Sequence, residues 1–235
     1  METDLLAFGP HPDDLEIGLG ATLAKHAALG HRVGLCDLTR GEMGSNGTPE
    51  GRMAEAEEAR VVLGAAWREN LGWPDRAIDG HADQLRAAAA LIRRARPRAV
   101  AIPYWDDRHP DHAAASRVLT EAVFNARLRR YQADGDPWHP EWVCYYFIND
   151  AGPASFVVDV SDHYDTKRRA LACYRSQFES RAAGAVETRL TSPRFMQLVE
   201  SRDAQFGALA GVAYAEGLVV REPVVRSHLL KTPKD

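Results

Sequence analysis

The chain has 235 residues, of which 45% are hydrophobic, and 29 basic against 33 acidic residues give a formal net charge of -4. This balance excludes a polybasic nucleic-acid surface, and no apolar stretch approaches the length of a membrane span. The length suits one α/β domain with a full core, so we expect residues 1–235 to form a single domain.

The redox and targeting signals favour a cytoplasmic protein. The first four residues are acidic overall and are followed by a very short apolar run, which argues against a secretory signal. The three cysteines, Cys36, Cys144 and Cys173, are far apart and lie in apolar or amphipathic stretches. We expect them to be buried, reduced thiols.

Strands and helices alternate along the first half of the chain. Apolar runs at residues 5–8, 33–38 and 99–104 are typical of buried parallel strands. Apolar residues at helical spacing predict helices over roughly 15–30, 53–63, 85–95 and 113–128, and the segment 39–51, rich in Gly and Ser, predicts a loop. This order predicts an α/β fold with a Rossmann-like, doubly wound, mostly parallel sheet.

The chain changes character after Gln132. Residues 142–148 and 155–160 look like two strands in succession, and a helix carrying Tyr164, Leu171, Tyr174 and Phe178 follows them. We interpret this part as a C-terminal strand-and-helix extension of the same domain.

Two histidine–proline–aspartate clusters stand out about a hundred residues apart. They are His11-Pro12-Asp13-Asp14 and His109-Pro110-Asp111-His112, and each directly follows a predicted strand. In an open parallel sheet, sites form outside the carboxyl ends of the strands. Imidazoles and carboxylates that supply fewer than four ligands are typical of a catalytic zinc with a position left for water.

Both clusters also have simpler interpretations. Asp13 and Asp14 could merely cap the helix that begins there, and alone they would favour that reading. A lone histidine would more often be structural. Pro110 suits the first helical position, so His109 precedes a helix and His112 lies in its first turn. Two histidines around Pro-Asp, echoing the first cluster, favour a metal site.

These motifs resemble the two signatures of the LmbE/PIG-L superfamily of zinc-dependent N-deacetylases. The first covers residues 8–14 with Glu16 and Gly18, and the second covers residues 107–112. Further blocks, at 38–44, 47–50 with Arg52, 70–72, 74–75, 174–178 and 214–217, are similar to the bacillithiol-biosynthesis branch, which deacetylates N-acetylglucosaminyl-malate. Related enzymes on other N-acetyl sugars share several blocks, so another N-acetyl sugar or small amide stays open as the substrate.

The resemblance implies a role for each residue of the clusters. One zinc ion per chain, or another divalent metal, would have three ligands: His11, Asp14 and His112. Asp13 would be the general base. His109 would stabilise the oxyanion or act as the acid, and Asp111 would orient its ring.

The resemblance also implies substrate contacts. Arg52 offers a planar fork suited to a carboxylate such as that of malate, although a solvated charge at a helix start is the alternative. Glu42 and Arg108 are further expected contacts, and Trp105 could stack on a sugar, although such a residue more often packs the rim of a site. The mycothiol branch carries a catalytic tyrosine where this chain has Asp107, so any tyrosine role must come from elsewhere. The expected partners are a small N-acetylglucosamine conjugate and copies of the same chain, as a trimer or hexamer, without nucleic acid or membrane.

Three other functions are weighed against this one. An iron oxygenase uses a similar ligand set but usually sits on an all-β barrel. A dinucleotide-binding protein would need its glycine motif in the turn before the helix, whereas residues 18–23 fall inside the first predicted helix. A non-catalytic sugar-binding module would not need both Asp13 and His109.

Overall fold

The computed structural model describes residues 2–179 and 186–225. The strands of this part form one seven-stranded sheet of order β3-β2-β1-β4-β5-β7-β6. Five of them are parallel: β1 (Leu5–Gly9), β2 (Val33–Thr39), β3 (Trp67–Trp73), β4 (Ala99–Pro103) and β5 (Trp142–Tyr146). Antiparallel pairing joins β7 (Ala215–Val219) to β5 and to the edge strand β6 (Phe156–Asp159). The predicted α/β class and mostly parallel sheet are confirmed.

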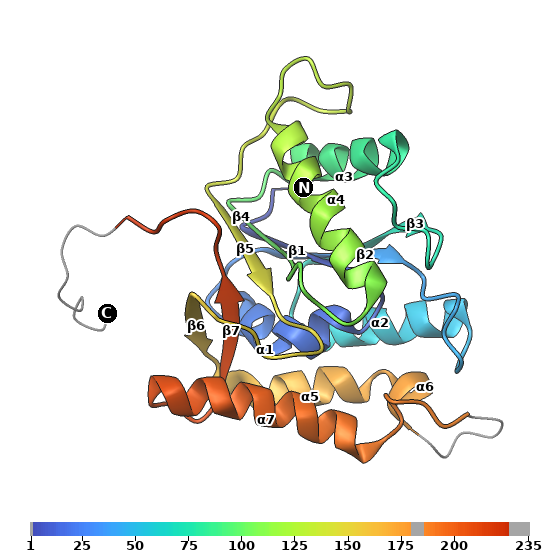
Figure 1. Cartoon of the computed structure of the whole chain (residues 1–235), viewed down its shortest axis with the longest axis vertical. Coiled ribbons are helices and arrows are strands. Elements are labelled where there is room, and N and C mark those ends of the chain that lie inside the picture. Colours follow the sequence, from blue (N-terminus) through green and yellow to red (C-terminus); the bar gives the residue numbers. More distant parts are fainter. Residues whose placement is uncertain (1, 180–185, 226–235) are drawn as a thin grey trace.

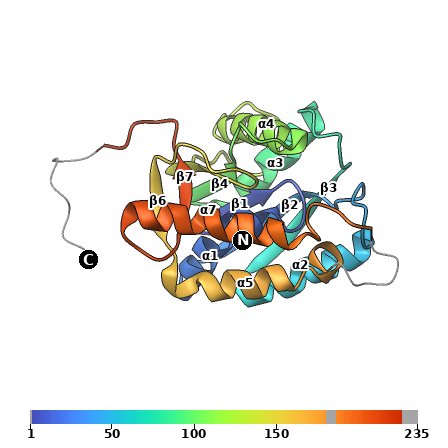
Figure 2. The ribbon, with the colours of Figure 1, turned by 60° about the horizontal axis from the view of Figure 1, so that its bottom comes forward.

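Helices cover both faces of the sheet (Figures 1 and 2). One face packs against α3 (Ala82–Ala95) and α4 (Pro110–Ala126), and the other against α1 (Asp14–Ala28) and α2 (Pro49–Leu63). The helix α5 (Tyr164–Ala172), entered through a 3₁₀ turn (Ser161–His163), packs on α1 and α2. Short α6 (Arg175–Phe178) follows it, and α7 (Pro193–Ala210) packs on β7 and β6.

The alternation of side chains along β1 shows how the two apolar cores arise. Leu6 and Phe8 point toward the core beneath α3 and α4, whereas Leu5 and Ala7 point toward α1 and α2. All four are buried, which is why the strand appears in the sequence as a continuous apolar run.

Three elements were not predicted, namely β3, α7 and β7. The edge strand β3 pairs only with β2 and has the sequence WRENLGW, which shows no regular apolar alternation.

The predicted loop at 39–51 ends early because Pro49 opens α2, and the side chain of Thr48 caps this helix by accepting the Gly51 N–H at 3.1 Å. The helix predicted to carry Tyr164 through Phe178 is two helices, α5 and α6.

The topology brings the two histidine clusters together. Because β1 and β4 are adjacent and parallel, the loops that leave them meet at the same edge of the sheet. The first loop leads into α1 and the second into α4. In the described part of the chain, no helix combines the length and the apolar character that a membrane crossing needs.

Candidate active site

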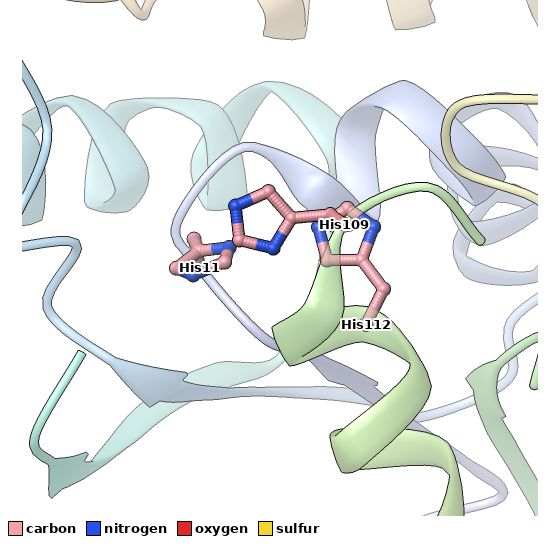
Figure 3. Close-up of side chains that lie close together, drawn as sticks. All are labelled: His11, His109 and His112. Carbon is pink, nitrogen blue, oxygen red and sulfur yellow. The ribbon is translucent and has the colours of Figure 1, made fainter. Parts of the chain in front are cut away.

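Three imidazoles from the two clusters lie side by side (Figure 3). His11 is on the loop after β1, and His109 and His112 are at the start of α4. The ring centroid of His11 lies 4.9 Å from that of His109 and 5.6 Å from that of His112, and the centroids of His109 and His112 are 4.6 Å apart. One nitrogen from each ring lies within 4.8 Å of the others, so these rings could hold a metal ion.

Asp14 lies between two of these rings. Its Oδ2 atom is 3.0 Å from Nδ1 of His11 and 3.3 Å from Nε2 of His112, and it also accepts the backbone N–H of His11 at 2.9 Å. Ligands at about 2.0–2.1 Å from a tetrahedral zinc are roughly 3.3 Å apart. The distances from Asp14 to His11 and to His112 are therefore close to those between ligands of one zinc ion.

In the rings of His11 and His112, the nitrogen that does not face Asp14 faces other carboxylates. Nε2 of His11 is 3.2 Å from Asp75 Oδ1 and 3.3 Å from Asp111 Oδ2, and Nδ1 of His112 is 3.1 Å from Asp107 Oδ1. Burial alone would lower the pKa of both histidines, but the carboxylates raise the pKa of His11 well above its usual value and that of His112 to about 9. Buried imidazoles enclosed by acceptors fit a bound cation, and the imidazole and carboxylate donors fit a divalent metal such as zinc.

Asp13 does not act as a helix cap. It occupies the N-cap position of α1 with φ 109°, and its side chain makes no capping hydrogen bond. Its Oδ2 atom instead accepts a hydrogen bond from Nη2 of Arg52 at 2.8 Å. Burial raises the pKa of Asp13 to about 7, although Arg52 acts in the opposite direction. A buried carboxyl group of this kind, beside the ligand candidates, is suited to proton transfer.

The structure gives Arg52 partners within the protein. We expected its guanidinium to meet a substrate carboxylate, but it is buried, pairs with Asp13 and donates from Nε to the carbonyl of Pro12 at 3.0 Å. Gly41, at φ 68°, makes room for this arrangement, because a Cβ atom there would overlap Nη1 of Arg52. Two of the three guanidinium nitrogens of Arg52 thus donate to partners within the protein, and Arg52 also lines the cavity described below.

The contacts of Asp111 also differ from expectation. Its carboxylate contacts His11 and accepts hydrogen bonds from Arg76, at 2.7 Å from Nη1 and 3.0 Å from the backbone N–H. Within the described residues it makes no hydrogen bond to the ring of His109. The backbone N–H of Asp111 donates instead to Nδ1 of His109 at 3.2 Å. A neutral His109 then carries its proton on Nε2, and burial, followed by the nearby His112 and His11, lowers the pKa of His109.

A cavity of about 510 Å³ adjoins these groups. Its lining includes the candidate ligands, Asp13 and His109, together with Asn149 and four arginines, Arg52, Arg76, Arg108 and Arg189. Arg108 therefore lies where it was expected. Asp75, Arg76, Asn149 and Arg189 were not identified from the sequence, although Asp75 belongs to one of the blocks that resemble the family.

Two expected substrate contacts do not line this cavity. The ring of Trp105 packs against Tyr104 and Tyr145, with centroids 4.3 and 4.9 Å away, and Arg221 lies over its face. Glu42 is exposed, and its carboxylate accepts the backbone N–H of Arg40. Trp105 thus contributes to packing, and Glu42 stabilises its own loop.

Comparisons with known proteins show which proteins this chain is similar to. The family model described as PIG-L, GlcNAc-PI de-N-acetylase, matches residues 6–123, which contain both histidine clusters. Diacetylchitobiose deacetylase of Thermococcus kodakarensis is 30% identical over 91% of this chain and 81% of its own length. A 1D-myo-inositol 2-acetamido-2-deoxy-alpha-D-glucopyranoside deacetylase 2 of Saccharopolyspora erythraea is 31% identical, over 79% and 87%. The crystal structure of the conserved protein TT1542 from Thermus thermophilus is 40% identical, with a TM-score of 0.88 over 98% of this chain and 100% of that one.

Proposed function

We propose that this chain, which belongs to the PIG-L (GlcNAc-PI de-N-acetylase) family, removes the acetyl group from an N-acetylglucosamine conjugate with an acidic aglycone. It is an N-deacetylase, a hydrolase of linear amide bonds, and two relatives named as deacetylases of N-acetylated sugars support that class of substrate. N-acetylglucosaminyl-malate is our first choice. The observation that carries the proposal is the convergence of His11, Asp14 and His112 beside the carboxyl group of Asp13 in one cavity.

The metal would be held by the two imidazoles and the carboxylate that lies between them. We assign His11, Asp14 and His112 to one divalent ion, with zinc as the first choice. A zinc ion there would act as a Lewis acid that polarises the acetyl carbonyl and lowers the pKa of water. His109 is left outside this set because its Nδ1 already accepts a backbone hydrogen bond, and because Asp14 contacts both of the other rings.

Asp13 and His109 would carry out the proton transfer and the charge stabilisation. Asp13 would accept a proton from the attacking water and deliver it to the departing amine, a task that suits a carboxyl group whose pKa is raised to about 7. Arg52 would hold this carboxylate in place. The Nε2–H of His109 would donate a hydrogen bond to the oxyanion that develops on the acetyl group.

We assign recognition of the acidic aglycone to Arg108 and Arg189, two other arginines of the cavity, instead of to Arg52. Arg76 is paired with Asp111, but Arg108 and Arg189 form no ion pair with a carboxylate in the part of the chain that the structure describes. Both are exposed, and both line the cavity. A guanidinium with free donors suits a substrate carboxylate.

A panel of N-acetylated substrates tests the proposal through acetate release by the zinc-loaded protein. The panel contains N-acetylglucosaminyl-malate, N-acetylglucosamine, a neutral inositol conjugate and diacetylchitobiose. We expect the highest kcat/KM with the malate conjugate. An equal kcat/KM for the neutral conjugates would contradict the preference for an acidic aglycone but not the deacetylase activity. If no substrate released acetate, the proposed activity on N-acetyl sugars would be wrong.

A further inference from the structure

We infer that Asp107 is a positioning residue that holds the imidazole of His112 in the tautomer whose Nε2 is free to bind the metal. This inference rests on the ligand set of the proposed function. It concerns the position at which the mycothiol branch carries a tyrosine, so an acidic side chain here calls for its own explanation.

The contact between Asp107 and His112 fixes where the proton lies on the ring. Oδ1 of Asp107 is 3.1 Å from Nδ1 of His112, and an ionised carboxylate can only accept. Nδ1 must therefore carry a proton, and the lone pair of the neutral ring is on Nε2. That atom faces Oδ2 of Asp14 at 3.3 Å, on the side where the ligand atoms converge.

Asp107 is itself held rigidly, so it can impose a position on the ring. Its side chain is 5% exposed. It accepts the backbone N–H of His109 at 2.8 Å, and it accepts both the side-chain amide and the backbone N–H of Asn149, at 2.9 and 3.2 Å. These donors come from the loop before α4 and from the segment after β5. The side-chain nitrogen of Asn149 is also 3.3 Å from His112 Nδ1, but its shorter contact is the one to Asp107.

The other ligand imidazole shows the same arrangement. Nδ1 of His11 faces Asp14, and its Nε2 faces Asp75 and Asp111, which lie outside the ligand set. Each ring thus has one nitrogen toward the metal position and the other toward acidic side chains. Carboxylates behind metal-binding histidines fix the ring orientation and strengthen the ligand, and their loss typically costs 10–100-fold in metal affinity.

Asp107→Asn provides the test, with Asp106→Asn as the matched control. Asp106 is the adjacent acidic residue of the same loop, and it is exposed. Zn²⁺ affinity is measured by competition between the metal-free protein and a chelator. We expect Asp107→Asn to bind Zn²⁺ about 10–100-fold more weakly, Asp106→Asn to match the wild type, and Asp107→Glu to recover part of the loss.

Nuclear magnetic resonance of the imidazole nitrogens provides a readout that a purely structural role would not move. In the zinc-loaded wild type, the proton of His112 should be on Nδ1, and in Asp107→Asn its signal should shift or exchange faster. A proton on Nε2 of His112 in the wild type would overturn the inference even if the variants failed to fold. Unchanged affinity and unchanged ring signals in a folded Asp107→Asn protein would overturn it as well.

A third variant separates this inference from the proposed function. If His112→Ala loses zinc while Asp107→Asn retains wild-type affinity, the ligand set stands and only the role of Asp107 falls. If His112→Ala retains stoichiometric zinc, His112 is not a ligand, and both the ligand set and the inference fall.

Discussion

Arg52 holds Asp13 through two hydrogen bonds, one to the carboxylate of Asp13 and one to the peptide carbonyl that precedes it. Nη2 of Arg52 lies 2.8 Å from Asp13 Oδ2, and Nε lies 3.0 Å from the carbonyl oxygen of Pro12. Asp13 has φ 109°, a left-handed backbone conformation that costs a non-glycine residue about 1–3 kcal/mol. These two hydrogen bonds offset the strain and fix the position of the proposed base. Their loss should therefore affect catalysis more than substrate binding.

Arg52→Ala should therefore lower kcat and leave KM nearly unchanged. The expected loss is about 1.5–3 kcal/mol, the usual contribution of a hydrogen bond to a charged group, or roughly 10–150-fold in kcat. Steady-state kinetics on the preferred N-acetyl conjugate measure it, and thermal unfolding confirms that the variant is folded. A raised KM with kcat intact would return Arg52 to substrate binding.

Asp13→Asn and Asp14→Asn should separate proton transfer from metal binding. Asp13 lies outside the ligand set, so Asp13→Asn should keep its zinc and lose roughly a hundredfold or more in kcat. Asp14 contacts both ligand imidazoles, so Asp14→Asn should lose metal and activity together. Atomic absorption gives the metal content of both proteins. Loss of zinc from Asp13→Asn would make Asp13 a ligand instead of the base.

Arg108→Ala and Arg189→Ala should weaken binding of the acidic aglycone. Both arginines line the cavity, and loss of a guanidinium–carboxylate contact should raise KM for N-acetylglucosaminyl-malate by roughly tenfold or more. Plain N-acetylglucosamine has no carboxylate, so its kinetics should change little. Equal losses on both substrates would show that these arginines do not contact the aglycone.

The parts of this site that the sequence predicts are those set by local patterns. Each histidine cluster follows an apolar run, and adjacent parallel strands end at one edge, so the meeting of His11 and His112 is predictable. The pairing of Arg52 with Asp13 is not predictable from the sequence, because it depends on how the first turn of α2 packs against the loop after β1. Asp111 shows the same limit, since the choice between His109 and Arg76 depends on a distant loop.

A buried charge network joins the unpredicted elements β7 and α7 to α5. Nζ of Lys167 lies 2.7 Å from Asp203 Oδ2 and 2.6 Å from Glu216 Oε1, and these side chains are fully buried. Glu216 also accepts the backbone N–H groups of Ala21 and Thr22 in α1, the helix that begins at Asp14. Charged residues of this kind obscure the apolar pattern on which strand prediction depends.

Lys167→Met should destabilise the fold strongly. It leaves the carboxylates of Asp203 and Glu216 without the cation between them, and removing one partner of a buried pair costs about 3–5 kcal/mol. Urea unfolding at pH 7 measures the loss. A change below about 1 kcal/mol would show that the network contributes little to stability. Lys25→Met is the control, because Lys25 is a half-buried lysine of α1 outside this network, whose Nζ donates to the carbonyl of Asp159.

The same variant should show an altered pH dependence. Burial alone would raise the pKa of Asp203, but Arg202 and Lys167 hold that pKa below its usual value of 3.8. In the wild type, the stability due to Asp203 is therefore present above about pH 3.8 and is lost as the pH falls through the lower, folded-state pKa. In Lys167→Met, of these two cations only Arg202 remains beside Asp203, so the pKa of Asp203 rises and protonation relieves part of the uncompensated negative charge. The stability deficit of the variant should shrink as the pH falls from about 7 toward about 4.

Gly41→Ala should impair the enzyme through Arg52 without altering any ionisable group. A Cβ atom at Gly41 would overlap the guanidinium of Arg52, which would have to leave Asp13. Gly30→Ala is the matched control, since Gly30 also has positive φ, 86° against 68°, but has no atom near its Cβ position. Both variants should lose about 1–2 kcal/mol of stability from the left-handed backbone, but only Gly41→Ala should lower kcat, toward the value of Arg52→Ala. The double variant Gly41→Ala/Arg52→Ala should then have a kcat no lower than that of Arg52→Ala alone, because both changes remove the same contact. Additive losses in kcat would mean that Gly41 acts independently of the hydrogen bond between Arg52 and Asp13.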